Sequence, residues 1–396
     1  MKKNIVFLLF FICVVQIVFA QSMDKTLVSS RIKCGPWLQA VTDSEFTVVW
    51  TTNVNSVVWV ELAPDDGSHF YAEVRPRYYQ SVDGRRPISK LHQVRIARLE
   101  PGKTYRYRIF QQAVLSDEGN RRVILGDAYG SDILKQKPYQ VKTLDKNAVD
   151  CRFSVMNDIH ENDSLFQKLS ERMLDRGNNF VVFNGDMLTQ IESRSQVEDY
   201  YMKSASKLFS GNTPIYAVRG NHEFRGAASY DFMKLFPTST GLPYYTVRQG
   251  PAFIVFMDSG EDKPDSDIRY YGLSLSDQMR AQEAEWLQKV VDSEEFRLAP
   301  IKIVVIHMPP MADGWHGVRE VDRLFMPILN KAGVDLMLCG HLHKLQYIDT
   351  DEQGNRFPTL INSNKYRVDV DVDQKSINLK VVDDKGSIIQ KHLLRK

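Results

Sequence analysis

The chain has 396 residues, a length that allows two or three domains and excludes a single small one. Hydrophobic residues make up 43% and charged residues 25%, which excludes a largely disordered chain, and the 16 prolines and 22 glycines follow no collagen-like period. Lysine and arginine number 51 against 49 aspartates and glutamates, so the overall charge does not indicate a nucleic-acid binder or an electrostatic membrane binder.

Residues 1–20 have the pattern of a secretory signal peptide. Two lysines open the chain, an apolar run from Ile5 to Phe19 follows, and Val18 and Ala20 occupy the −3 and −1 positions of a cleavage site. The alternative is an uncleaved membrane anchor, but the run is shorter than the ~20 apolar residues that a spanning helix needs. We therefore expect cleavage after Ala20, export to the periplasm or the exterior, and no transmembrane segment in the mature chain.

Three cysteines remain after such cleavage: Cys34, Cys151 and Cys339. Export permits disulfides, but an odd count leaves at least one thiol unpaired. Cys339 lies in an apolar run and is expected to be a buried thiol, whereas a bridge between Cys34 and Cys151 stays open. The sequence has no CxxC pair, which argues against a thiolate metal site.

Residues 27–145 are expected to form an all-β sandwich. The segments that read as strands are rich in β-branched and aromatic residues or alternate with a period of two: Phe46–Trp50, Ser56–Glu61, Gln93–Arg98 and Thr104–Phe110. Turn signals such as Asp83–Gly84 and Pro101–Gly102 separate them, and short strands at this spacing are typical of a β-sandwich. The segment Leu99–Tyr105 resembles the corner of fibronectin type III domains, where a tyrosine hydroxyl ties a loop to the sheet.

Residues 150–396 have a different sequence pattern, in which apolar strands alternate with helical segments. The predicted buried strands are Phe153–Met156, Phe180–Phe183, Ile215–Val218, Phe253–Met257, Ile303–Ile306 and Leu336–Leu338. The predicted helices are Ser164–Arg176, Gln196–Phe209, Ser276–Val291 and Val318–Lys331. Gly333 is expected to cap the last helix, and the stretch from Lys344 to Leu394 returns to strands. This order predicts an α/β fold with a mixed sheet core and helices outside.

Polar motifs follow five of these apolar runs. In chain order they are Asp158–His160, Gly185–Asp186, Gly220–Glu223, His307 and Gly340–His343. Open α/β sheets place their sites at such strand ends, and five of the nine histidines fall inside the motifs. Carboxylate and amide oxygens among imidazoles suit manganese, iron or zinc, so the sequence predicts a transition-metal site.

The spacing within the motifs favours more than one ion. Asp158 and His160 are two residues apart, so their side chains point the same way if the strand stays extended, and both can reach one metal. His341 and His343 repeat this arrangement, and the two oxygens of Asp186 can bridge two cations. Two metals about 4 Å apart can clamp the attacking and leaving oxygens of a phosphoryl transfer.

The ordered set of five motifs resembles the calcineurin-like metallophosphoesterases, whose domain is an α/β/β/α sandwich. With the sandwich that precedes it, the mature chain is similar to the purple acid phosphatase architecture. The resemblance implies two transition-metal ions (manganese, iron or zinc). It assigns Asp158, His160, Asp186 and His343 to the first ion. It assigns Asp186, Asn221, His307 and His341 to the second.

The same resemblance implies catalytic roles. His222 would contact the phosphate and assist the leaving group, and Arg219, directly before the motif, would bind phosphate as a bidentate donor. The alternatives are a structural His222 and an Arg219 that pairs with Glu223 or another carboxylate. Glu223 itself is expected either to support the ligands or to act as a helix cap.

The chain departs from the purple acid phosphatase pattern at two positions. That family typically has Asp-x-Gly in the first motif and an iron-binding tyrosine three residues after the bridging aspartate. This chain has His160 and Thr189 at those places. We therefore expect no purple charge-transfer band, and neither ferric iron nor an acidic pH optimum can be carried over.

The expected activity is hydrolysis of phosphate esters, with monoesters preferred and phosphodiesters as the alternative. An exported, non-catalytic adhesion or binding protein is the minor alternative, because a fold does not fix a function. His316 is expected either to line the substrate pocket or to sit in a solvated loop. Residues 260–271 are either a lid or a plain surface loop. No nucleic-acid-binding domain is evident, and the sequence does not indicate an oligomeric state.

Overall fold

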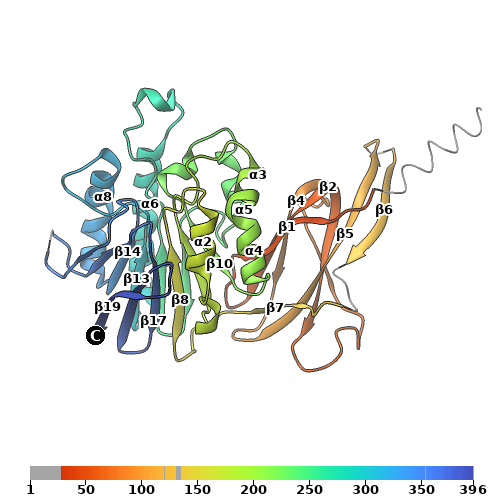
Figure 1. The fold of residues 1–396 in the computed structure, drawn as a ribbon, viewed down its shortest axis with the longest axis horizontal. Helices are drawn as coiled ribbons and strands as arrows, with labels where there is room; N and C mark the ends of the chain where they lie inside the picture. Colours follow the sequence, from red (N-terminus) through yellow and green to blue (C-terminus); the bar gives the residue numbers. More distant parts are fainter. Residues whose placement is uncertain (1–27, 120, 131–134, 353, 396) are drawn as a thin grey trace, which may run out of the picture. The chain divides into compact units, whose positions relative to one another are not determined.

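The structure is a computed structural model that describes residues 28–119, 121–130, 135–352 and 354–395 (Figure 1). The expected signal peptide lies outside the described residues. Within these ranges no helix has both the length and the apolar character needed to cross a membrane. The cysteines at 34, 151 and 339 are all buried and none forms a disulfide, so the expected buried thiol at Cys339 is confirmed.

The described chain forms two compact units. The first unit contains the described residues up to Lys33 together with Trp50–Val94 and Arg106–Pro138. The second unit contains Cys34–Val49, Arg95–Tyr105 and the chain from Tyr139 onward. Two segments of the expected all-β domain therefore belong to the second unit. The limits 27–145 and 150–396 stay predictions.

Between residues 32 and 142, the described part of the chain contains seven strands. They are β1 (Ile32–Gln39), β2 (Glu45–Pro64), β3 (Arg77–Tyr79), β4 (Ser89–Ala97), β5 (Thr104–Asp117), β6 (Val123–Gly130) and β7 (Tyr139–Lys142). They pair in the order β1-β2-β5-β6, with β3 and β4 on β2 and β7 on β5. The predicted strands Phe46–Trp50 and Ser56–Glu61 are parts of one 20-residue strand, β2. Its exposed Asn53 and Asn55 are residues typical of turns, which is why the sequence pattern indicated a break there.

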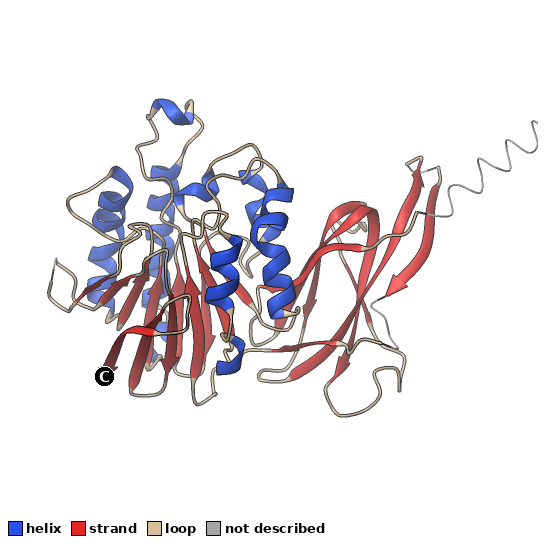
Figure 2. Ribbon diagram, viewed as in Figure 1, coloured by secondary structure: helices blue, strands red, loops and turns tan. Residues whose placement is uncertain are grey.

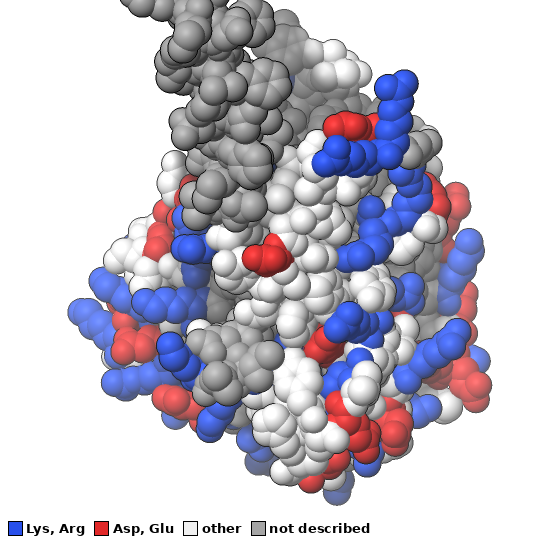
Figure 3. All heavy atoms as spheres, turned by 90° about the vertical axis from the view of Figure 1, so that its right-hand side faces the viewer, with Lys and Arg blue, Asp and Glu red and all other residues white. Residues whose placement is uncertain are grey.

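The corner at Tyr105 has the expected contact. Its hydroxyl accepts the backbone N–H of Glu100 at 3.0 Å, across the turn at Pro101–Gly102. Gly102 has a φ of +68°, which an L side chain adopts only with strain. The strands and this corner agree with an all-β segment, while the fibronectin type III likeness stays a prediction. In the face drawn in Figure 3, basic and acidic side chains are interspersed, in keeping with the balanced composition.

The rest of the chain forms two six-stranded sheets. Their orders are β10-β9-β8-β17-β18-β19 and β11-β12-β13-β14-β16-β15. The first sheet contains β8 (Cys151–Met156), β9 (Phe180–Asn184), β10 (Ile215–Val218), β17 (Arg367–Val372), β18 (Ser376–Val382) and β19 (Ile388–Arg395). The second contains β11 (Tyr245–Gln249), β12 (Ala252–Phe256), β13 (Ile301–Val305), β14 (Leu336–Cys339), β15 (Gln346–Ile348) and β16 (Thr359–Ile361).

Helices lie on the outer faces of these two sheets (Figure 2). They are α2 (Asp163–Ser170), α3 (Arg194–Val197), α4 (Lys203–Phe209), α5 (Phe232–Leu235), α6 (Ser276–Asp292), α7 (Glu294–Leu298) and α8 (His316–Ala332). Leu287 of α6 and Phe325 of α8 share one hydrophobic core with Val304 of β13. Tyr216 of β10 stacks on Phe256 of β12 with ring centroids 5.4 Å apart, so the sheets face each other.

Two of the predicted helices differ in detail. The pattern from Ser164 to Arg176 is broken after α2, where Arg172 has a φ of +63°. The pattern from Gln196 to Phe209 is one helical run, but Glu198–Met202 forms a π turn between α3 and α4. The prediction for α8 is confirmed, because its apolar stripe is buried and Gly333 caps it with a φ of +69°.

The sheet topology brings the five polar motifs to one edge. Strands β8, β9 and β10 run parallel, and so do β12, β13 and β14 in the other sheet. Carboxyl ends of parallel strands meet at the same edge of a sheet, and the two sheets face each other. The loops that follow β8, β9, β10, β13 and β14 therefore converge.

Candidate metal centre

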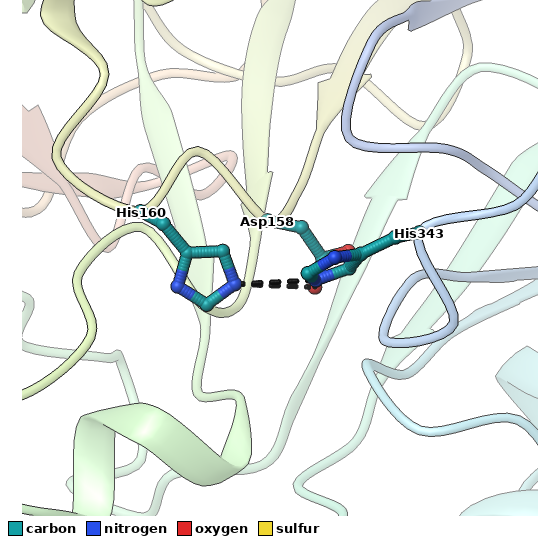
Figure 4. A group of neighbouring side chains, drawn as sticks. All are labelled: Asp158, His160 and His343. Atoms are coloured by element: carbon teal, nitrogen blue, oxygen red, sulfur yellow. Dashed lines mark hydrogen bonds and ion pairs between the residues drawn. The ribbon is translucent and has the colours of Figure 1, made fainter.

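The first group of side chains comes from the loops after β8 and β14. Asp158, His160 and His343 each offer one ligand atom, all within 4.8 Å of one another (Figure 4). His343 Nε2 lies 3.2 Å from Asp158 Oδ1 and 3.2 Å from His160 Nε2. The premise of an extended strand is wrong, because Asp158 and His160 have φ values of +55° and +45°. A tight left-handed turn brings them together instead.

The second group joins the loops after β9, β13 and β14. Asp186, His307 and His341 again place one ligand atom each within 4.8 Å. His307 Nε2 lies 3.1 Å from Asp186 Oδ2. Its Nδ1 is 2.8 Å from the carbonyl oxygen of Asn184, which can only accept, so this nitrogen carries the proton. The lone pair of Nε2 is therefore left for a cation.

Four buried atoms in these loops have no hydrogen-bond partner in the described part of the chain. They are Asp158 Oδ1, Asn221 Oδ1, His307 Nε2 and His341 Nε2. An unpaired buried polar group costs about 1–3 kcal/mol, so four in one place require an explanation. All four are electron-pair donors, and cations between them would satisfy all four. The donor set therefore fits metal ions.

The electrostatics of the site also favour cations. Burial alone would lower the pKa of His307, but Asp186 and Asp158 raise it to about 10. Without a cation, Nε2 therefore holds a second proton beside Asp186 Oδ2, and a bound metal ion would replace that proton. Burial likewise opposes ionisation of Asp186, yet His307 and His222 hold the pKa of that carboxyl below its usual range. Two ionised carboxylates buried side by side repel each other unless positive charge lies between them.

Glu223 holds the loops after β9 and β10 through hydrogen bonds to their backbone. Its carboxylate accepts the backbone N–H groups of Asp186 at 2.8 Å, Met187 at 2.9 Å and Gly220 at 2.8 Å. Burial, followed by the charge of Asp186, raises the pKa of Glu223 to about 7. Both expected roles are present, because the bond to Gly220 closes the start of the short helix η4 (Asn221–Phe224).

His222 lies beside both groups of ligands. Its Nδ1 is 2.6 Å from the carbonyl oxygen of Thr189, which fixes the proton on that nitrogen. Its Nε2 lies 3.9 Å from Asp186 Oδ2, and His222 forms a third close group with His160 and Asp186. The side chain is partly exposed, and Arg225 Nη1 lies 3.3 Å from Nε2.

Comparison with known proteins agrees with this geometry. Residues 151–345 match the family model of the calcineurin-like phosphoesterases. This match spans 195 of the 396 residues and makes this part of the chain similar to the calcineurin-like phosphoesterases. Among curated proteins, the chain is 29% identical over 198 residues to purple acid phosphatase 4 of Arabidopsis thaliana and 26% identical over 192 residues to purple acid phosphatase 17 of the same plant.

Each of these two alignments covers 46% of this chain and 57% of the relative, so the chain spans little more than half the length of the curated relatives it matches. Among solved structures, purple acid phosphatase PPD1 from yellow lupin seeds aligns with a TM-score of 0.65 at 15% identity. That alignment covers 91% of this chain and 74% of the lupin chain. At this identity the likeness shows the fold alone.

Thr189 of the phosphoesterase domain occupies the place expected for an iron-binding tyrosine. Its hydroxyl donates to Glu161 Oε2 at 2.8 Å, and its carbonyl oxygen accepts a hydrogen bond from His222 Nδ1. The residue therefore orients a neighbouring side chain and has no phenol oxygen to offer a metal.

Arg219 and His316 lie outside the three close groups. Arg219 Nε donates to Asp258 Oδ2 at 2.6 Å, and its guanidinium stands 4.0 Å over the ring of Phe224. It therefore pairs with a carboxylate other than Glu223. His316 Nε2 lies 2.7 Å from Asp277 Oδ1, so this ring is tied to α6. Their expected contacts with substrate stay predictions.

Three residues near the site have no place in the motifs. Asn157 Nδ2 donates to Asp158 Oδ2 at 2.6 Å, and the Trp315 ring centroid lies 5.7 Å from that of His341. Arg225 Nη1 lies 3.3 Å from His222 Nε2. Asn157 directly precedes one motif and Arg225 lies two residues after another, which is a signal that could have found them. The position of Trp315 depends on how the loop before α8 folds.

Proposed function

We propose that this protein is a dinuclear metal-dependent phosphoesterase that hydrolyses phosphomonoesters. The observation that carries the proposal is the set of four buried donor atoms around Asp186 that have no hydrogen-bond partner in the described part of the chain. Two of them, Asp158 Oδ1 and His307 Nε2, lie 3.2 Å and 3.1 Å from another ligand atom, as groups that share a cation do. Asp158, His160, Asp186 and His343 would hold one ion. Asp186, Asn221, His307 and His341 would hold the other. The donor types suit manganese, iron or zinc, and the Thr189 position argues for a pair without tyrosinate-bound iron.

Bound at these positions, two such ions would lower the pKa of water and neutralise the charge of the phosphoryl group. The chain supplies the remaining parts. Glu223 fixes the loops that carry Asp186 and Asn221, and the carbonyl of Thr189 holds the ring of His222. We assign His222 Nε2 the proton that passes to the departing oxygen. In the reaction, a bond would form between phosphorus and a water oxygen while the ester P–O bond breaks. The water would give up one proton to solvent, the alcohol would leave with the proton from His222 Nε2, and the ring would be reprotonated from solvent.

Substitution Asp186→Asn tests this proposal, because an amide cannot bridge two ions as a carboxylate does. We expect the variant to lose at least one equivalent of metal and about 10²-fold or more in kcat on 4-nitrophenyl phosphate. Asp175→Asn, an exposed site in the short helix η2 (Leu174–Arg176), serves as the matched control and should retain both. Full metal content and full activity in Asp186→Asn would refute the mechanism.

The preference for monoesters rests on the likeness to purple acid phosphatases, and diesters are the second candidate because Asp-x-His is found in many diesterases of this family. Turnover of 4-nitrophenyl phosphate against its bis ester separates the two. We also propose that residues 1–20 direct export, with Gln21 as the first residue of the mature protein, and that the strands before residue 145 form a fibronectin type III-like sandwich. N-terminal sequencing of the exported protein tests the former.

A further inference from the structure

A pocket with a volume of about 780 Å³ is lined in part by Glu223, Phe224 and Arg225, which directly follow His222 in the chain. Its lining includes Arg225, whose Nη1 lies 3.3 Å from His222 Nε2. The lining also includes Glu223, which holds the backbone of Asp186. The pocket is therefore next to the nitrogen to which we assign the proton for the leaving group.

The wall of this pocket away from His222 is apolar and aromatic. Tyr230, Tyr271, Leu273 and Leu275 line it and are 78%, 85%, 75% and 67% exposed. Large apolar side chains gathered at one exposed place indicate a binding surface. The segment that carries three of them follows the short helix η6 (Ile268–Tyr270) and extends beyond the sheet layers (Figure 1).

The cations that line the pocket already have anionic partners. Arg225 donates to Glu261 and Asp262, at 2.9 Å and 3.0 Å. Lys263 also pairs with Asp262, at 2.6 Å, and Arg269 pairs with Asp267 at 2.8 Å. Arg219 is held by Asp258, as described above. This balance does not favour a second phosphate or another strongly anionic group in the pocket.

We propose that the pocket binds the apolar, aromatic part of the alcohol that leaves the phosphate ester. This inference rests on the proposed function, which places the leaving oxygen at His222. The rest of the alcohol must then extend away from the metal ligands, and the adjacent hollow offers aromatic and leucine side chains without free charge. The preferred substrates are thus monoesters of bulky apolar or aryl alcohols. In hydrolysis, a water oxygen bonds to phosphorus and loses one proton to solvent. The aryl oxygen keeps the electrons of its broken bond to phosphorus, takes the proton from His222 and departs as the neutral phenol.

The test compares 4-methylphenyl phosphate with 4-butylphenyl phosphate on the metal-loaded protein. The two phenols are almost equally acidic, so a difference in kcat/KM reports binding of the longer chain. We expect the butyl ester to be favoured by at least about tenfold. Leu273→Ser and Tyr230→Ser should each lower this ratio several-fold, whereas Leu298→Ser should leave it unchanged. Leu298 is a matched control, since it is 72% exposed and does not line the pocket.

Binding of 4-butylphenol, measured by calorimetry, provides a readout independent of turnover. We expect binding to the wild type and to Leu298→Ser, and several-fold weaker binding to Leu273→Ser. Equal kcat/KM for the two esters, with no binding of the phenol, would overturn the pocket assignment and leave the phosphoesterase proposal standing. Failure to hydrolyse either ester would overturn the proposed function, and with it the role of the pocket in holding a leaving group.

Discussion

Asp186 is the residue on which the candidate metal centre depends most, because it belongs to two of the three close groups of ligands. Its carboxylate is positioned by backbone: Oδ1 accepts the N–H of His222 at 3.0 Å. The motifs in the sequence were sufficient to nominate the side chains that meet here. They could not give the left-handed turns at Asp158, His160, His341 and His343, since such φ values are unusual for residues other than glycine. They also could not give the Asp258 partner of Arg219, which lies on another strand end.

Gly220 packs so closely against Asp186 that it tolerates no side chain. A Cβ at this position would stand 2.1 Å from Asp186 Oδ1. We expect Gly220→Ala to displace the carboxylate and to lower both metal content and kcat by about tenfold or more, while the protein still folds. Metal analysis and steady-state kinetics check this. In the control Gly126→Ala the nearest atom would be 3.6 Å away, and neither quantity should change. Unaltered metal binding in Gly220→Ala would show that Asp186 is not needed in its present position.

His92, a residue of the first compact unit, makes stability depend on pH. The ring is buried, its Nε2 lies 2.9 Å from the hydroxyl of Thr52, and burial lowers its pKa to about 3. An unfolded histidine titrates near pH 6.5, so between about pH 6.5 and 3 the unfolded chain binds the additional proton. Acid therefore destabilises the fold through His92, by about 2 kcal/mol at pH 5.

Removing this titration should flatten the pH dependence. We expect the melting temperature of His92→Gln to fall less than that of the wild type as the pH is lowered from 7 to 5. Thermal unfolding followed by fluorescence at several pH values gives the comparison. An equal fall in the melting temperature of the two proteins from pH 7 to 5 would contradict the role assigned to His92.

At the scale of elements, α6 and α8 illustrate what periodicity can and cannot predict. Both helices were predicted from their sequence patterns, α8 from its apolar stripe, and their ends lie within two residues of the expected ones. The π turn between α3 and α4 leaves no such pattern, because one additional residue in a turn hardly alters a hydrophobic stripe. The segment 260–271 also could not be resolved from sequence. Its first part is buried, and Arg225 ties Glu261 and Asp262 down, whereas Ile268 and Tyr271 are exposed.

Arg280 attaches that segment to α6. Its side chain is fully buried, Nε donates to the carbonyl of Ser259 at 2.8 Å, and Nη2 donates to the carbonyl of Glu261. Arg280→Met keeps the length but leaves both buried carbonyls without their donor. We expect a loss of about 2–5 kcal/mol in the free energy of unfolding, measured by urea denaturation.

The matched control for Arg280 is Arg323 on α8, which is exposed and pairs with Glu320. Arg323→Met should cost less than about 1 kcal/mol, as is usual for a surface ion pair. Equal unfolding midpoints for the Arg280→Met protein and the wild type would mean that the segment after β12 is held by other contacts.

At the scale of the whole molecule, the order of strands and motifs was enough to predict the α/β fold with mixed sheets and the edge at which the polar loops converge. Strand order in the chain fixes which carboxyl ends share an edge, so this inference needs no side-chain detail. The division into compact units was not predictable in the same way. Segments such as Cys34–Val49 precede the phosphoesterase domain in sequence but belong to its compact unit, since Trp37 Nε1 donates to the carbonyl of Leu235 at 2.9 Å.

The claim that these loops bind a pair of ions is tested most directly by anomalous X-ray diffraction from crystals of the manganese-loaded protein. We predict two peaks about 4 Å apart, one among Asp158, His160 and His343, the other among Asn221, His307 and His341, with Asp186 between them. The same crystals of Asp186→Asn should lose at least one peak. A single peak remote from Asp186, or none in the wild type, would contradict the account.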